Sequence, residues 1–121
     1  MDKRQREYYD KMLLRDRAFT FYVGDRLGCL ITYYIGNGNM DRYTKRDPWT
    51  VIDDEPETGT TCYVDQLITD HNKENRKYAW TLWHVLIQYI KEKYPQVERL
   101  KWKRYNHKMR RINVHSKDFR R

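Results

Sequence analysis

The chain has 121 residues, of which 39% are hydrophobic and 35% charged, and its formal net charge is +8. This length fits one domain, and no apolar run is long enough to cross a membrane. The four His and two Cys residues lack metal-ligand spacing, so the sequence predicts no metal site. Because the first ten residues, MDKRQREYYD, contain no apolar segment, we expect no secretory signal and a cytoplasmic protein.

The positive charge is concentrated at the end of the sequence. Residues 99–121 contain ten Lys and Arg residues and one acid, a net charge of +9, whereas residues 1–98 have a net charge of −1. Such a segment can bind a polyanion, for example nucleic acid, an acidic protein surface or the phosphates of a cofactor. It can equally be a solvated surface that has no partner.

The first half of the chain predicts a helix, a hairpin and a long loop. Residues 3–17 have the pattern of an amphipathic helix that covers a sheet. Its apolar positions are Tyr8 or Tyr9, Met12 and Leu13. Residues 18–36 alternate around a Gly-Asp turn and predict a β-hairpin. Residues 37–60 predict a loop, with one short strand at 49–52, which forms either a lid over a site or a plain insertion.

The second half predicts a strand–helix–strand unit followed by one more strand. Residues 61–69 form a strand with large side chains on both faces, as in the centre of a sheet. Residues 76–94 form a long helix with little polar surface, which ends before Pro95. Residues 97–105 alternate as a strand, and 109–115 return beside it. Residues 116–121 are expected to be frayed.

The strand with the sequence TCYVDQLIT contains a carboxyl group in apolar surroundings. Simple alternation places Asp65 on the same face as Tyr63 and Leu67. Burial would raise the pKa of Asp65 toward a range that suits a general base. Alternatively, Asp65 only pairs with Arg99 or Lys101 of a neighbouring strand.

This order of elements resembles that of the GCN5-related N-acetyltransferase (GNAT) superfamily. The segments that carry the resemblance are YVDQLITD, RKYAWTLWHVLIQYIKEKYP and VERLKWKRYN. The resemblance implies an α/β (α+β) fold, in which a mixed sheet carries one long central helix and a basic C-terminal hairpin. We expect residues 1–121 to form a single domain of this kind.

The superfamily resemblance also implies a cofactor. In the family, a loop with the pattern Arg/Gln-x-x-Gly-x-Gly/Ala opens the main helix and binds the pyrophosphate of acetyl-CoA through backbone amides. The matching hexapeptide keeps the arginine but has Ala79 and Thr81 where glycines are usual. The implied ligand is acetyl-CoA or another acyl-CoA. The implied cofactor-binding residues are Arg76, Lys77, Tyr78, Ala79, Trp80 and Thr81.

Within the superfamily, the chain is most similar to the RTX toxin-activating lysine acyltransferases. Asp65 resembles the aspartate that precedes their cofactor loop, and the segment 102–104 resembles part of their basic end. Those enzymes also use a histidine in the N-terminal part, whereas the first histidine here is His71. The resemblance implies transfer of an acyl group, most simply acetyl, to an amine such as a protein lysine. Asp65 would act as base and Tyr105 as acid.

Two other functions fit the same sequence. The first is a binding protein on this fold that has lost catalysis, with small phage structural or host-takeover proteins as the analogy and the virion as its location. The second is nucleic-acid binding through the basic segment. Its candidate residues are Lys101, Lys103, Arg104, Lys108, Arg110 and Arg111. In the first case Tyr105 would be a packing aromatic, and in the second Tyr105 and His107 would supply rings on which bases can stack.

Overall fold

The computed structural model describes residues 2–37, 41–54, 58–69, 73–106 and 111–119, with the backbone alone at 41, 44, 73–77, 104–106 and 111–113. The elements are α1 (Lys3–Leu14), β1 (Ala18–Val23), β2 (Arg26–Gly36), α2 (Asp41–Thr44), β3 (Thr61–Thr69), α3 (Lys73–Lys93), β4 (Arg99–Asn106) and β5 (Arg111–Asp118). Within this description, no helix is both long and apolar enough to span a bilayer.

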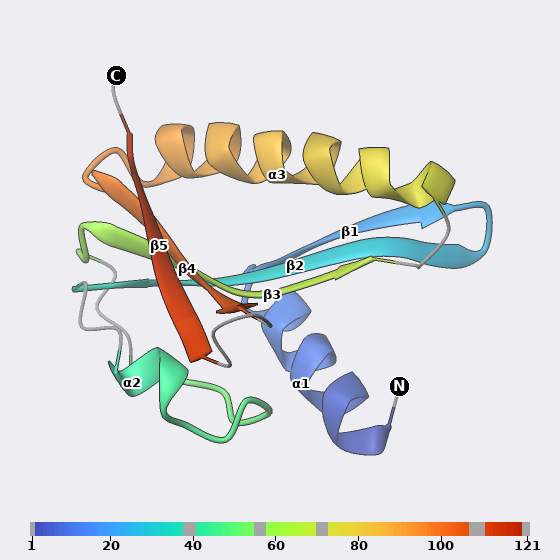
Figure 1. Ribbon diagram of the computed structural model, residues 1–121, viewed down its shortest axis with the longest axis horizontal. Coiled ribbons are helices and arrows are strands. Elements are labelled where there is room, and N and C mark those ends of the chain that lie inside the picture. The colour runs from blue at the N-terminus through green and yellow to red at the C-terminus, as the bar shows by residue number, and fades with distance from the viewer. Residues whose placement is uncertain (1, 38–40, 55–57, 70–72, 107–110, 120–121) are drawn as a thin grey trace.

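The five strands form one mixed sheet in the order β1-β2-β3-β4-β5. Neighbouring strands are antiparallel except β3 and β4, which are parallel because α3 connects them. The long helix α3 covers one face of the sheet, and α1 and α2 cover the other (Figure 1). The predicted mixed sheet with a long helix packed on it is therefore confirmed, and β3 has its predicted bounds.

The two faces of the sheet bury different side chains. The α3 face is mainly aliphatic and includes Ile31, Ile35, Leu86, Ile90 and Leu100. The opposite face is rich in tyrosine. Its buried residues are Tyr8, Tyr9, Met12, Leu30, Tyr34, Tyr43, Ile52 and Tyr63. Large rings bury much area per residue, so they help a chain with few aliphatic side chains to form a core on both sides of its sheet.

Helix α1 covers the tyrosine-rich face, as predicted. It begins with a capping box, in which the side chain of Asp2 accepts from the Gln5 amide and the Gln5 side chain accepts from the Asp2 amide. Tyr8 and Met12 are buried, but Leu13 is 42% exposed, so its predicted place on the apolar face is wrong. The buried residues lie one turn apart along a narrow stripe, and Leu13 falls at its edge.

The loop between β2 and β3 differs from the sequence prediction. The chain forms one turn of helix, α2, and no strand is present at 49–52 within the described residues. The chain turns there because the Asp47 carbonyl accepts from the Thr50 amide, and the Asp47 carboxylate accepts from the Trp49 amide at 3.1 Å. The Trp49 ring then packs edge-on against Tyr8 and Tyr9.

The end of the described chain also differs from its prediction. Residues 116–118, expected to be frayed, complete β5. Phe119 is buried against the α3 face, and its amide donates to the Glu98 carbonyl at 2.8 Å. A buried ring and a backbone hydrogen bond hold this segment, whereas a polar sequence alone suggested a solvated tail.

Two glycines lie where the chain is packed too closely for a Cβ atom, so substituting them tests this packing. A Cβ atom on Gly36 would lie 1.9 Å from the hydroxyl oxygen of Tyr43, and one on Gly59 would lie 2.5 Å from the carbonyl oxygen of Gly36. We expect Gly59→Ala to lower the free energy of unfolding by about 1–3 kcal/mol, because backbone atoms must move. Gly36→Ala should cost less in the background Tyr43→Phe, which lacks the clashing oxygen. Urea unfolding of the four variants measures this, and equal losses from Gly36→Ala in both backgrounds would contradict it.

Candidate functional site

Strands β3 and β4 separate along their length. They pair over four residues, from Thr61 opposite Arg99 to Val64 opposite Trp102. Beyond that point β3 stays paired with β2 as far as Thr69, and β4 stays paired with β5. Past Val64 and Trp102, β3 and β4 therefore form no backbone pairs with each other. A slot lies between them there, beneath the first half of α3.

A β-bulge at Asp65 lies where the strands begin to part. Thr32 of β2 pairs with Gln66 and Tyr33 pairs with Val64, so Asp65 is the extra residue of β3. A bulge bends its strand and increases the local twist. It also shifts the alternation by one residue, which turns Leu67 toward α3 and leaves Ile68 against the tyrosine-rich cluster. The prediction that Leu67 shares the face of Asp65 is therefore wrong.

Two adjacent cavities follow the slot. The first, of about 430 Å³, has mainly hydrophobic walls, and the second, of about 310 Å³, lies deeper toward the bulge. Leu67, Trp83 and Trp102 line both cavities. The first is completed by Ala79, Trp80 and Lys117, and the second by Val64, Asp65 and Lys103. The slot thus combines indole and aliphatic surfaces with one carboxyl group and two ammonium groups.

The Asp65 carboxylate is held from three directions. Its side chain is 1% exposed, and Oδ1 lies 3.0 Å from Nη2 of Arg46, whose side chain is 12% exposed. Oδ2 accepts a hydrogen bond from the Tyr8 hydroxyl and a longer one, of 3.4 Å, from Thr32 Oγ1. One predicted alternative partner, Arg99, instead pairs with Asp118 at 3.0 Å.

The same network extends away from the slot through tyrosine hydroxyls. The hydroxyls of Tyr8 and Tyr34 lie 2.9 Å apart, and Arg46 Nη2 donates to both, at 3.2 and 3.4 Å. The Ile52 amide also donates to the Tyr34 hydroxyl at 3.3 Å. The network therefore joins α1, β2, the segment after α2 and β3. Sequence reasoning identified Asp65 but not Arg46, because no local pattern links an arginine in an irregular loop to a carboxylate 19 positions later.

Burial and charge act on the Asp65 carboxyl in opposite directions. Desolvation raises its pKa above the ordinary value of 3.8, and the positive charge of Arg46, the Tyr8 hydrogen bond and the charge of Lys103 lower it. Desolvation is the largest effect, so the pKa is raised overall. Burial, together with the nearby Asp65, also raises the pKa of Tyr8. Tyr8 therefore stays protonated and donates its hydrogen to the carboxylate.

The predicted cofactor hexapeptide lies inside α3 instead of at its start. The helix begins at Lys73, so the amides of residues 78–81 lie beyond the first turn and are hydrogen-bonded within the helix. Tyr78 stacks on Phe21, with ring centroids 4.6 Å apart, whereas Ala79 and Trp80 line the 430 Å³ cavity. Thr81 is exposed. The first turn of α3, residues 73–76, therefore includes only Arg76 of the hexapeptide, and Ala79 and Thr81 lie further along the helix.

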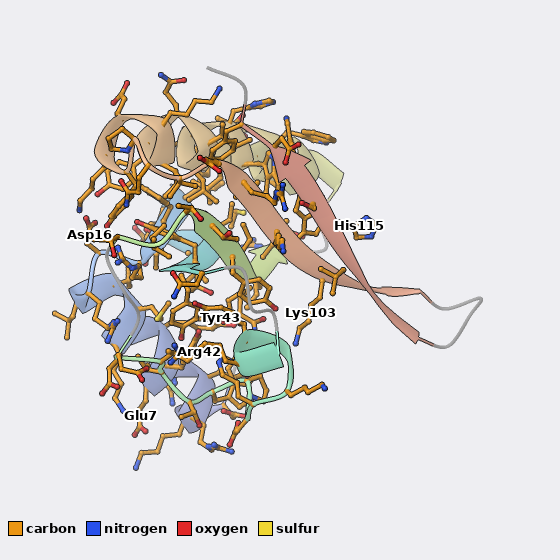
Figure 2. All side chains as sticks on the ribbon, turned by 90° about the vertical axis from the view of Figure 1, so that its left-hand side faces the viewer. Glu7, Asp16, Arg42, Tyr43, Lys103 and His115 are labelled. Carbon is orange, nitrogen blue, oxygen red and sulfur yellow. The ribbon has the colours of Figure 1, made fainter. Side chains whose placement is uncertain are left out.

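Several predicted site residues are only partly described. The side chains of Arg76, Lys77, Arg104, Tyr105 and Arg111 lie outside the described part, as do Lys108 and Arg110 entirely. Lys101 and Lys103 are half-buried on β4. Figure 2 shows Lys103 projecting toward the α2 layer, on the face that also holds Tyr43. No group of three or more His, Cys, Asp or Glu side chains in the described residues is arranged to hold a metal ion.

The ion pair between Arg46 and Asp65 predicts a pH-dependent loss of stability. Arg46→Met should cost about 3–5 kcal/mol at neutral pH, because it leaves a buried carboxylate without its cation. Since burial raises the pKa of Asp65, a protonated carboxyl favours the folded state, and the cost should shrink as the pH falls toward 4. Urea unfolding between pH 4 and 8 measures this cost. The double variant Arg46→Met/Asp65→Asn should lose the pH dependence; a cost that stays constant with pH would refute the assignment.

Comparison with known proteins supports the fold. No protein-family pattern matches the sequence, and no curated protein matches it either. Among solved structures, the chain is similar to the 2.50 Å crystal structure of a candidate acetyltransferase from Staphylococcus aureus Mu50, with a TM-score of 0.53 and 16% sequence identity. The match covers 80% of this chain and 59% of that chain, so this chain spans less than two thirds of its neighbour. The chain therefore has a GNAT-like fold, as its sequence predicted.

Proposed function

We propose that the chain binds an acyl-CoA in the slot between β3 and β4 and transfers the acyl group to an amine. The observation that carries this proposal is the parting of the two strands after Val64 and Trp102, which leaves two joined cavities beneath α3. An amide-containing, flexible arm fits such a slot. Its amides can bond to the unpaired strand edges, while its methylene groups contact indole and leucine surfaces.

The phosphates of the cofactor would lie at the start of α3. The free amides of the first helical turn and the helix dipole favour an anion there. The sequence adds positive charge at Lys73, Arg76 and Lys77. The exposed Trp80 ring lines the first cavity. This arrangement needs no glycine within the helix, which accounts for the presence of Ala79 and Thr81.

A bound acyl-CoA supplies a thioester whose carbonyl carbon an amine can attack. In the transfer an N–C bond forms and the C–S bond breaks, while the amine loses a proton and the departing thiolate gains one. Asp65 is the candidate proton acceptor, because it lines the inner cavity and burial raises its pKa. Its carboxylate is almost fully buried, so the proton would reach it through a water molecule. Tyr105 remains the candidate acid, and acetyl and a protein lysine remain the simplest donor group and acceptor.

A second candidate is a binding protein that holds the ligand without turnover. The observation that favours it is the state of Asp65, whose carboxylate is 1% exposed and engaged by Arg46, Tyr8 and Thr32. In this second candidate, the hydrogen bonds and the ion pair of Asp65 hold the bulge in place, and Asp65 takes no part in catalysis. A phage structural or host-takeover role belongs to this second candidate.

Ligand binding can be tested by thermal unfolding. Acetyl-CoA at 1 mM should raise Tm, because a ligand at a hundredfold excess over its Kd stabilises the folded state by about 2.7 kcal/mol. Leu67→Trp should abolish the rise by filling the space shared by both cavities. Leu14→Trp is the matched control, since Leu14 is 88% exposed on α1, on the other side of the sheet. An unchanged Tm in the unmodified protein would rule out the proposed cofactor.

A turnover assay distinguishes the acyltransferase from the non-catalytic binding protein. Release of free CoA thiol from acetyl-CoA should depend on an added lysine peptide, and Asp65→Asn should slow it by about 10²–10⁴-fold, the usual contribution of a general base. The Tm rise with acetyl-CoA in the same variant controls for loss of the site. Retained binding with no release above the uncatalysed rate, in the unmodified protein, would identify the non-catalytic binding protein instead.

A further inference from the structure

Strand β5 forms one edge of the sheet, and no described strand pairs with its outer side. It pairs with β4 over eight successive residues without a register shift. The opposite edge strand, β1, is shorter and has a register shift between Phe21 and Tyr22. Natural edges are usually protected by a bulge, a proline, very short length or charged side chains, lysine above all. Strand β5 is eight residues long, has no bulge or proline, and carries Lys117 as the one lysine among its described side chains. It therefore presents a regular row of unpaired backbone donors and acceptors.

This edge is accessible. The residues from Val114 to Asp118 are all exposed. Figure 2 shows that β4 and β5 extend beyond the helices on both sides of the sheet. The His115 ring stacks on Trp102 of β4. An extended segment can therefore approach β5 without displacing any described element.

The positive charge around the β5 edge favours an acidic segment as its binding partner. Val114 and Ser116 lie on the face that carries Lys101 and Lys103 of β4, whereas Lys117 lies on the other face. A strand added to β5 would lie about 4.8 Å from it and twice that from β4, within reach of long lysine side chains on both faces. Residues 99–121 have a net charge of +9, which disfavours pairing with a second copy of the same edge.

We propose that β5 binds an extended, acidic segment of a partner protein, which adds to the sheet as a sixth strand. Backbone hydrogen bonds to β5 supply the affinity, and carboxylates facing the lysines supply the selectivity. The surface at β4 and β5 fits the addition of a protein strand better than the stacking of nucleic-acid bases. The ring of Trp102 is covered by His115, at 5.6 Å and nearly parallel, and meets Trp83 edge-on at 5.3 Å. Lys117 and Lys103 also line the two cavities of the slot. The backbone edge that the segment would bind lies on the outer side of β5, away from the gap between β3 and β4, so the inference does not rest on the proposed function.

The test uses a fluorescent eight-residue peptide with two Glu-Glu-Val-Val repeats, whose carboxylates lie on both faces of a strand, titrated with the full chain in a fluorescence anisotropy assay. A matched peptide carries N-methyl groups on two adjacent central residues, which blocks both of its edges without changing its charge. We expect the N-methylated peptide to bind at least tenfold more weakly. Amide chemical shifts should change at residues 111–118 but not at Ala18–Val23.

Charge reversal supplies the control on the protein. Lys101→Glu/Lys117→Glu should weaken binding at least tenfold, whereas Lys3→Glu/Lys11→Glu on α1 changes the net charge equally and should have little effect. Three results would overturn the proposal. They are equal affinity for the N-methylated peptide, tighter binding of an eight-nucleotide single-stranded DNA, and a concentration-dependent dimer that blocks the peptide.

Discussion

The slot depends on one buried ion pair, between Arg46 and Asp65. The extra residue of β3 is a carboxylate, and burying it without a cation would be costly. Arg46 supplies the cation from the segment after α2 and also donates to two tyrosine hydroxyls. The bulge can therefore persist in the centre of the sheet, and it is the bulge that turns Leu67 toward α3 and precedes the parting of β3 and β4.

The two faces of the sheet are packed with different kinds of side chain. The α3 face is mainly aliphatic, so its packing depends on the shapes of its side chains. The α1 face is built from tyrosines, whose hydroxyls need partners once they are buried. Tyr8 and Tyr34 obtain partners from the ion-pair network, but the hydroxyls of Tyr9 and Tyr63 have no hydrogen-bond partner among the described residues. These two hydroxyls lie on the face that is also covered by the irregular segment between β2 and β3.

The sequence was sufficient to predict the fold, because the elements have strong patterns of their own. Alternation defined β3, and the apolar stripe of α3 through Leu86 and Ile90 packs on the sheet. The expectation that α3 is covered around most of its girth is wrong, since Trp80 and Val85 are exposed. The site was less predictable, since it depends on contacts between residues that are far apart in the sequence. The bulge reverses the alternation after Asp65, and its cation comes from Arg46, in a loop without periodicity. The start of α3 was misplaced by three residues because polar first-turn residues resemble a loop.

The hydrogen bond from Tyr8 to Asp65 joins residues that are 57 positions apart. During synthesis, α1 leaves the ribosome well before β3, so its buried tyrosines have no carboxylate to meet until at least residue 65 is available. The helix has only twelve residues, too few to be stable alone in water. We therefore expect the first helix of the chain to be among the last elements to dock, after β2 and β3 have paired. Helix α1 would then close the fold, with Tyr8 completing the contacts around the bulge.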